Sequence, residues 1–206
     1  MENTVNRIIL RGALSGGPIF SHENHGRRFY QFALEVPRLS GTPDILQVLA
    51  PEPLLDALEV TESDCVEAAG QIRSFNNRLE NGRRLVISVY ATTLRLCGGE
   101  PVNQVELTGA VCKPPVLRKT PLGREICDVM LAVNRHYRRS DYLPCIFWGR
   151  TAREVSRLTV GDRLSLTGRL QSRNYNKVVP GGVERRIAYE VSAITANPYS
   201  SSNAPV

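Results

Sequence analysis

Asn103-Gln-Val-Glu-Leu-Thr-Gly-Ala110 repeats the pattern of Asn6-Arg-Ile-Ile-Leu-Arg-Gly-Ala13, which lies 97 residues earlier. Each stretch has an asparagine, two apolar residues separated by one position, and a Gly-Ala pair at the same places. Apolar residues at period two are typical of a β-strand with one buried face, and a glycine inside such a strand indicates a bulge or a sharp bend. The pattern therefore predicts a duplicated β unit, each copy opened by a bent strand.

The duplication extends through both halves of the chain. Matching residues keep an offset of 97 as far as Asp44 and Asp141. The offset then becomes 98 at Gly70 and Gly168, and 102 at the last strand. Loop insertions produce such shifts, and a long series of matches in register is the mark of an internal repeat. We therefore divide the chain into repeat one (residues 1–97), a linker (98–102), repeat two (103–197) and a short flexible tail (198–206).

Each repeat is predicted to be mainly β with one short helix. A helix is expected at 151–158, where apolar residues share one face, and prolines open an equivalent helix at 53–58. Five short strands with glycine bends are typical of a small five-stranded barrel. The strands predicted in repeat two are 105–111, 125–133, 142–148, 163–172 and 186–194.

Charge separates the two repeats more sharply than the formal net charge of +6 indicates. Residues 1–100 carry 10 Lys and Arg against 12 Asp and Glu, whereas residues 101–206 carry 16 against 8. Nearly all the basic residues are arginines, which both stack on rings and pair with phosphates. The second half is therefore predicted to bind a polyanion, and the first half is not.

The stretch 131–150 carries most of the features expected of a nucleic-acid site. It holds the single tryptophan, Trp148, two of the seven tyrosines and a cluster of arginines. On a strand, Tyr142, Ile146 and Trp148 would share one face. Exposed rings offer surfaces on which unstacked bases can stack, and arginines between them can bind phosphates. The alternative is that both faces of this strand are buried. The alternating positions, expected in the core, are Leu143, Cys145 and Phe147.

With these elements in this order, repeat two resembles the bacterial single-stranded DNA-binding protein family. The resemblance implies a mainly β chain of two tandem OB-fold barrels, each a five-stranded Greek key with one short helix. It also implies sequence-independent binding of single-stranded DNA, without catalysis, in replication, recombination or repair. Repeat one shares the frame of the pattern. The segments that carry the resemblance are Asn103 to Gly109, Leu131-Ala-Val133, Phe147-Trp-Gly-Arg-Thr-Ala152, Val160-Gly-Asp162, Gly168-Arg-Leu-Gln-Ser-Arg173 and Tyr189-Glu-Val191.

Four aromatic positions of that family stack on bases. The resemblance places them in repeat two at Tyr137, Tyr142, Trp148 and Tyr175. The equivalent residues of repeat one are not aromatic, and they are Ser40, Ile45, Pro51 and Asn77. We therefore expect repeat two to bind DNA and repeat one to support folding, assembly or a partner contact.

Basic residues near these aromatics are the candidates for phosphate contacts. The alternative for any one of them is a solvated surface charge, or an ion pair with Asp141 or Glu190. Two further candidates, Arg118 and Lys119, are expected in a loop before the second strand of repeat two. The candidates flanking the aromatics are Arg135, Arg138, Arg139, Arg150, Arg169, Arg173 and Lys177.

The expected partners are single-stranded DNA and a second copy of the chain. The family commonly assembles four barrels, so two barrels in one chain imply a homodimer. Stacking does not distinguish ribose from deoxyribose, so RNA stays open as a ligand. The family usually ends in a long tail with an acidic tip that recruits other proteins, whereas this chain ends in the uncharged segment 200–206, so recruitment by that route is not expected.

A second hypothesis assigns the barrels to protein partners. In a primosome-type or mobile-element adaptor, DNA binding would be incidental, and the four rings would be buried in an interface or a core. A DNA-binding protein would leave the same rings exposed on one face. The exposure of these rings therefore separates the two hypotheses.

The sequence predicts neither an enzyme nor a cofactor. It has no GxSxG motif, no P-loop and no paired acids in a phosphoryl-transfer arrangement, and His22-x-x-His25 lacks further metal ligands at a suitable spacing. The five cysteines form no CxxC pair and no secretory leader precedes them, so we expect reduced, mostly buried thiols. No stretch approaches the ~18 apolar residues of a membrane span. These features predict a cytoplasmic protein, and the resemblance implies that it is bacterial and nucleoid-associated.

Overall fold

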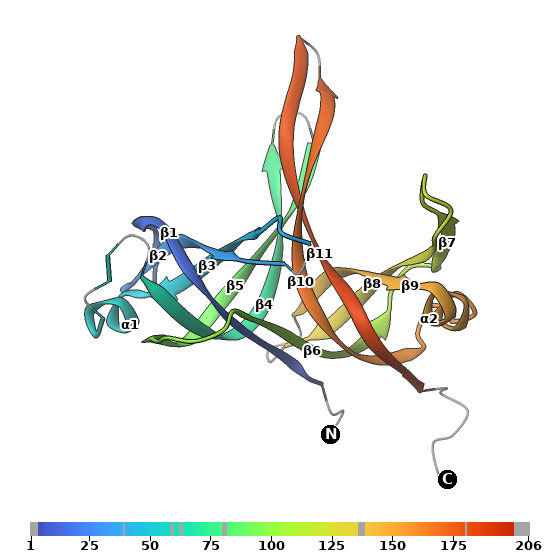
Figure 1. The fold of residues 1–206 in the computed structure, drawn as a ribbon, viewed down its shortest axis with the longest axis horizontal. Helices are drawn as coiled ribbons and strands as arrows, with labels where there is room; N and C mark the ends of the chain where they lie inside the picture. Colours follow the sequence, from blue (N-terminus) through green and yellow to red (C-terminus); the bar gives the residue numbers. More distant parts are fainter. Residues whose placement is uncertain are drawn as a thin grey trace.

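The computed structural model describes residues 4–38, 40–58, 60–61, 64–79, 82–135, 139–179 and 181–199. Within these residues each repeat forms a set of strands and one short helix (Figure 1). The elements of repeat one are β1 (Asn6–Asn24), β2 (Arg27–Val36), β3 (Asp44–Pro51), α1 (Glu52–Asp56), β4 (Cys65–Leu79) and β5 (Gly82–Leu96). Those of repeat two are β6 (Val102–Val111), β7 (Val116–Lys119), β8 (Glu125–Asn134), β9 (Ser140–Trp148), α2 (Gly149–Val155), β10 (Arg163–Val179) and β11 (Gly182–Tyr199).

Each repeat closes into a five-stranded barrel. In repeat one the strands pair in the ring β1–β2–β3–β5–β4 and back to β1, and β3 runs parallel to β5. In repeat two the ring is β6–β8–β9–β11–β10 and back to β6, with β9 parallel to β11 and β7 added beside β8. The predicted pair of five-stranded barrels is therefore confirmed, and closure leaves neither ring with a long free edge.

Alternation within the strands builds the core of each barrel. Along β3, Leu46 and Val48 are fully buried, and the alternate residues Gln47 and Leu49 are half-buried. Along β9, Leu143 and Phe147 face the core of repeat two with exposed fractions of 1% and 0%. Side chains of successive strand residues point to opposite faces, so the same alternation that fills the core also displays a second set of side chains outside.

Glycines stand where the strands bend from one partner to the next. A Cβ at Gly109 would lie 2.5 Å from the carbonyl oxygen of Ala132, where β6 has left β1 and joins β8. A Cβ at Gly168 would lie 2.4 Å from the carbonyl oxygen of Ser192, beside the bulge between β10 and β11. Both distances are far shorter than a van der Waals contact, so only glycine lets these backbones approach.

Two long hairpins leave the barrels on the same side of the molecule (Figure 1). We call the β4–β5 hairpin arm one and the β10–β11 hairpin arm two. In arm two, β10 and β11 pair from Arg163 opposite Tyr199 to Val179 opposite Gly182, whereas the predicted strands were much shorter. The outer part of the arm buries little, and without a buried face its residues lack the apolar alternation that reveals a strand.

Other elements also differ from the prediction at their boundaries. Arg118 and Lys119 lie in β7 and not in a loop; all four residues of this edge strand are exposed, so it shows no alternation. The helix of repeat two begins at Gly149, two residues before the predicted start, and ends at Val155. The last strand continues to Tyr199, into the segment predicted to be a flexible tail.

The two barrels share one continuous sheet through β1 and β6, which pair antiparallel from Asn6 opposite Leu107 to Arg11 opposite Val102. Each of these strands also carries a side chain that fixes the arm of its own repeat. Asn6 exchanges two hydrogen bonds with the backbone of Ile72, and Asn103 does the same with Leu170. The asparagine that opens each repeat thus ties its own strand to the base of its own arm.

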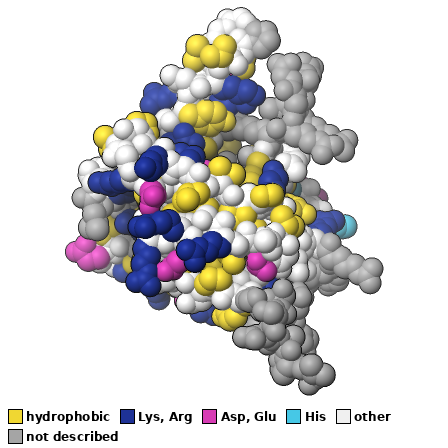
Figure 2. Space-filling model, turned by 90° about the vertical axis from the view of Figure 1, so that its right-hand side faces the viewer, with side chains coloured by type: hydrophobic (Ala, Val, Ile, Leu, Met, Phe, Trp, Pro, Cys, Tyr) yellow, Lys and Arg dark blue, Asp and Glu magenta, His cyan; other side chains and the backbone are white. Residues whose placement is uncertain are grey.

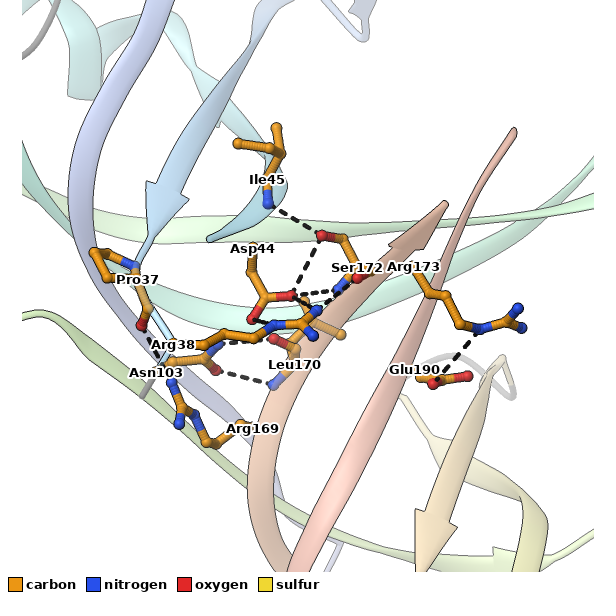
Figure 3. Close-up of polar contacts among 10 residues, drawn as sticks. All are labelled: Pro37, Arg38, Asp44, Ile45, Asn103, Arg169, Leu170, Ser172, Arg173 and Glu190. Carbon is orange, nitrogen blue, oxygen red and sulfur yellow. Dashed lines mark hydrogen bonds and ion pairs between the residues drawn. The ribbon is translucent and has the colours of Figure 1, made fainter. Parts of the chain in front are cut away.

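A second set of contacts, which we call the joint, ties each arm to the opposite barrel. Asp44 of repeat one accepts hydrogen bonds from Arg38 and, at 2.6 Å, from the backbone N–H of Ser172 in arm two (Figure 3). The guanidinium of Arg38 also donates to the Ser172 carbonyl oxygen at 2.6 Å, and the Ile45 N–H donates to the Ser172 hydroxyl at 3.1 Å. Arm two is therefore held by repeat one.

The other half of the joint repeats this arrangement with the roles of the barrels exchanged. Asp141 of repeat two accepts hydrogen bonds from Arg135 and, at 2.5 Å, from the N–H of Ser74 in arm one. Arg135 also donates to the Ser74 carbonyl oxygen at 3.1 Å. Asp44 and Asp141 are both fully buried, and a buried carboxylate is tolerated only when it is paired and hydrogen-bonded.

Candidate nucleic-acid interface

The outward face of β9 presents a row of apolar and aromatic side chains. We call this row, formed by Tyr142, Pro144, Ile146 and Trp148, the β9 platform. Tyr142 is 46% exposed and Trp148 is 41% exposed, whereas Ile146 between them is buried. The alternative in which both faces of this strand are buried is therefore wrong for the two rings and right for Ile146. The neighbouring strand β8 extends the surface beneath them, with Ala132 opposite Tyr142 and Ile126 opposite Trp148.

Polar contacts hold the ring of Trp148 and the backbone of Tyr142, and both side chains stay partly exposed. The indole N–H of Trp148 donates to the Ser192 hydroxyl at 3.1 Å, which fixes the ring against β11. The backbone N–H of Tyr142 donates at 2.7 Å to the hydroxyl of Ser74, so arm one of the other repeat positions this residue. A ring that is already oriented loses less conformational entropy when a base stacks on it.

Tyr175 lies on arm two, beyond the barrel, and is half-buried. The guanidinium carbon of Arg173, two residues away on the same face, lies 5.8 Å from the centre of its ring. Arg186 is the cross-strand partner of Tyr175. Arm two therefore places one tyrosine among arginines, which suits a base with its phosphates.

The candidate cations of repeat two do not all stay free for phosphate. Arg118 pairs with Asp128, and Arg150 pairs with Glu154 at 2.8 Å on the exposed side of α2. Arg169 reaches across to the carbonyl oxygen of Pro37 at 3.4 Å. Lys119, Arg139 and Lys177 are exposed. Exposed surface pairs contribute little, so the paired arginines can still exchange a carboxylate for a phosphate.

Arg135 has a structural role in the joint and not the free position expected for a phosphate ligand. Its guanidinium is engaged by the carboxylate of Asp141 and by the carbonyl of Ser74. The alternative considered for it, an ion pair with Asp141, is the arrangement observed. Releasing it would leave the buried Asp141 carboxylate with only the more distant guanidinium of Arg73, at 3.4 Å, as ion-pair partner, which is costly. Tyr137 and Arg138, also predicted at the site, lie outside the described residues.

Two acidic side chains reach the same surface. Asp128 is neutralised by Arg118, and Glu190 of β11 lies 4.0 Å from the guanidinium of Arg173. Burial raises the pKa of Glu190 above its ordinary value, and the nearby Arg173 opposes that rise. Ionised Glu190 is therefore disfavoured where it lies, and its charge would repel a phosphate passing over arm two.

The structure adds a cation that the sequence did not single out. Arg124 lies beside Trp148, and with Lys119 it lines a recess of about 470 Å³ next to the indole. The signal in the sequence is weak, because Arg124 follows a turn and no aromatic residue is adjacent to it. Seen from the side of β7 and α2, Lys and Arg side chains gather over one part of the surface, with hydrophobic side chains among them (Figure 2).

The equivalents of the stacking residues in repeat one lie at the same places of the barrel. Ile45 and Pro51 are half-buried at the two ends of β3, Ser40 is exposed, and Asn77 is exposed on arm one. Repeat one thus keeps the frame of the surface without these four rings.

Of the five cysteines, Cys127 and Cys145 are buried, but Cys65, Cys97 and Cys112 are half-buried, so the expectation of mostly buried thiols is wrong for three of them.

In the part of the chain that the structure describes, no helix is long and apolar enough to cross a membrane. The same residues contain no group of three or more His, Cys, Asp or Glu side chains that could hold a metal ion.

A closed five-stranded barrel with one parallel pair and a short helix between its third and fourth ring strands in chain order defines an OB-fold module, and in repeat two this module carries an aromatic outer face. The chain is a tandem pair of such modules. Residues 102–198, which cover repeat two, match the single-strand binding protein family.

Individual relatives agree with this assignment. Single-stranded DNA-binding protein A of Bacillus subtilis is 40% identical over 81 residues, which are 36% of this chain and 47% of that protein. Single-stranded DNA-binding protein 2 of Listeria innocua is 36% identical over 81 residues, which are 36% of this chain and 51% of that protein. The chain thus spans about half the length of the curated relatives it matches.

The whole fold has a solved counterpart. The wild-type single-stranded DNA binding protein of Thermus aquaticus superposes with a TM-score of 0.79 over 98% of this chain and 97% of its own, at 22% sequence identity. At that identity the likeness establishes the shared fold, and both barrels and both arms take part in it.

Proposed function

We propose that this protein binds single-stranded DNA without sequence preference, by stacking bases on repeat two and pairing phosphates with the arginines around it. The observation that carries the proposal is the pair of exposed rings, Tyr142 and Trp148, at the two ends of the β9 platform. A hydrogen bond fixes the ring of Trp148 and another fixes the backbone of Tyr142, while both side chains stay partly exposed. The names of the relatives of repeat two agree with this ligand.

The geometry favours stacking over the reading of base edges. The platform between the rings consists of Pro144 and Ile146, which offer apolar contact and no hydrogen bonds. A base stacked on an aromatic ring gains about 1–3 kcal/mol, whichever base it is. Phosphates would be bound by exposed or exchangeable cations, among them Lys119, Arg124 and Arg173. The exposure of the platform rings counts against the hypothesis of a protein adaptor.

The assembly we propose is a homodimer that brings four barrels together. The chain already contains two barrels in one sheet, so one further pairing would complete the arrangement that the resemblance implies. Light scattering tests this directly, since a dimer has twice the 22.9 kDa mass of the chain. In the cell the protein would act where single strands are exposed on the bacterial chromosome, in replication, recombination or repair.

Titration with oligo-dT, followed by the intrinsic fluorescence of Trp148, tests the proposed function. We expect strong quenching at low salt and weaker binding as salt is added. If about five phosphates are neutralised, the slope of log K against log salt should be near −3.5, at ~0.7 per phosphate. Oligo-U in place of oligo-dT determines whether RNA is bound too.

Variants separate stacking from general charge. Trp148→Ala and Tyr142→Ala should each weaken binding by about 1–3 kcal/mol, whereas Val160→Ala, at a 58% exposed position outside the platform and the recess beside Trp148, should not. Unchanged affinity in both platform variants would overturn the stacking surface. No binding of oligo-dT by the parent protein would refute the function itself.

A further inference from the structure

A groove of about 1370 Å³ lies between the two arms and is walled by both repeats. Tyr175 and Lys177 line it from arm two, and Phe75 lines it from arm one. Pro144, from the middle of the β9 platform, also borders it. The groove therefore begins where the surface of repeat two ends, at Pro144 and Tyr175.

The far side of the groove is the corresponding surface of repeat one. Gln47 and Leu49 of β3 border it there. At the offset of 97 residues, they are the equivalents of Pro144 and Ile146. The groove thus connects the platform of one barrel to the same place on the other. The side chain of Gln47 accepts a hydrogen bond from Gln31 at 2.7 Å, so this end of the groove is polar and uncharged.

Phe75 supplies repeat one with a ring at a position that a residue-by-residue comparison misses. It is 55% exposed and stands on β4 two residues before Asn77, the equivalent of Tyr175. Side chains two residues apart on a strand point to the same face. The aromatic ring of arm one is therefore displaced by one step along the same face of the arm, and it is not lost.

The charge along the groove suits a polyanion. Lys177, Arg185 and Arg186 line it, against the single carboxylate of Glu184 among the described lining residues. That carboxylate is already paired with Arg186 at 2.5 Å. Apolar side chains such as Leu49, Leu85 and Ile187 also line the groove and can pack against bases. An apolar protein segment would leave the cations without partners, so rings, apolar side chains and cations together fit a strand of nucleic acid better.

We propose that single-stranded DNA bound to repeat two crosses this groove and continues onto repeat one, where a base stacks on Phe75 and the strand passes over Gln47. This rests on the proposed function, and it replaces the expected division of labour in which repeat one takes no part in binding. A strand on both barrels covers a longer site than repeat two alone.

The test compares two lengths of oligo-dT on the full chain. One oligomer of about 10 nucleotides fits the ~4–16 nucleotides that one OB fold covers, and one of about 35 exceeds two such sites. Phe75→Ala should lower the affinity for the long oligomer about 5- to 150-fold, the loss of one stacked base, and leave the short one unchanged. Gln47→Glu, which keeps the side-chain shape and adds a negative charge, should act in the same direction.

Control variants make each outcome decisive. Leu96→Ala removes a 47% exposed apolar side chain of repeat one outside the groove and should change neither affinity. Trp148→Ala should weaken both oligomers. If Trp148→Ala weakens binding but Phe75→Ala and Gln47→Glu leave the long oligomer unaffected, the crossing is refuted and the proposed function stands. An equal loss for both lengths in Phe75→Ala also refutes the crossing. If Trp148→Ala has no effect either, the proposed function fails with it.

Discussion

Ile8 and Val105 lie directly opposite each other in the β1–β6 pairing, and they are equivalent positions of the two repeats. A residue that pairs with its own equivalent marks a local two-fold axis, as in a symmetric dimer interface. The asparagine contacts and both halves of the joint follow the same symmetry. The chain is therefore organised as a two-barrel unit in which each arm is held by the opposite barrel.

This symmetry predicts that the two halves of the joint contribute equally to the free energy of unfolding. Asp44→Asn and Asp141→Asn should each lower the free energy of unfolding by about 2–4 kcal/mol. Breaking a fully buried ion pair costs about 3–5 kcal/mol, and the arginines here are partly exposed, which reduces the cost. Chemical denaturation of the single variants measures both values.

The two halves should differ in their effect on DNA. Asp141 precedes Tyr142 and accepts from Ser74, so its loss frees one end of the β9 platform. Asp141→Asn should therefore weaken oligo-dT binding in the folded protein more than Asp44→Asn does. Equal binding by the two variants would mean that the joint does not position the platform.

The barrels were predictable because their evidence is local and repeated. Apolar alternation marks β8 and β9, and the recurrence of Gly12 at Gly109 fixes where each opening strand bends. The same alternation placed Tyr142 and Trp148 on the face of β9 opposite the core. Their exposure was therefore one of two alternatives, and burial of both faces was the other.

The remaining features depend on contacts between distant residues. Arg135 was predicted to be a phosphate ligand because it lies near the aromatic residues in the sequence. The ion pair with Asp141 was one of several alternatives, and the sequence alone could not select it. The outer halves of the arms and β7 bury little, so no pattern marks them. Phe75 was missed because positions were compared one by one, whereas a strand presents the same face at every second residue.

Glu190 gives the interface a dependence on pH. Burial raises the pKa of its carboxyl, so the folded protein keeps this proton at a pH where free glutamate has lost it. Its contribution to stability is full below pH ~4.3, the ordinary value, and is lost as the pH rises through the raised pKa. Above the raised pKa the ionised side chain therefore costs stability and repels phosphate.

We accordingly expect oligo-dT binding to strengthen as the pH falls through the raised pKa of Glu190, and Glu190→Gln to bind more tightly above that pKa with a flatter pH profile. The gain should be on the order of threefold, in the range of a single exposed charge pair. Glu106→Gln makes the same replacement on the central sheet, at a half-exposed side chain, and should change neither. A wild-type profile that matches that of Glu190→Gln would exclude this role.

Gly109 tests the bend that closes the barrel of repeat two. Gly109→Ala would place a methyl group 2.5 Å from the Ala132 carbonyl oxygen, so the backbone of β6 or β8 would have to move. Overpacking of this kind costs about 1–3 kcal/mol. Gly98→Ala is the matched control, because nothing lies within 4 Å of a Cβ there. The midpoints of denaturation should fall for the first variant and stay unchanged for the second.

Cys65 and Cys97 are cross-strand neighbours at the base of arm one, with their Sγ atoms 3.3 Å apart and the Cys97 N–H donating to the Cys65 carbonyl oxygen. Burial raises the pKa of Cys97 to about 11, so at pH 7 its thiol is protonated and a poor nucleophile. We expect glutathione disulfide to oxidise this pair slowly at pH 7 and about tenfold faster for each unit of pH up to 9. One thiolate displaces a glutathione, the second thiol displaces the other, and two glutathiones are released for one new disulfide. Peptide mapping after timed quenching should find a Cys65–Cys97 link that Cys97→Ser abolishes and Cys112→Ser leaves intact; a rate that does not change with pH would contradict the part played by burial.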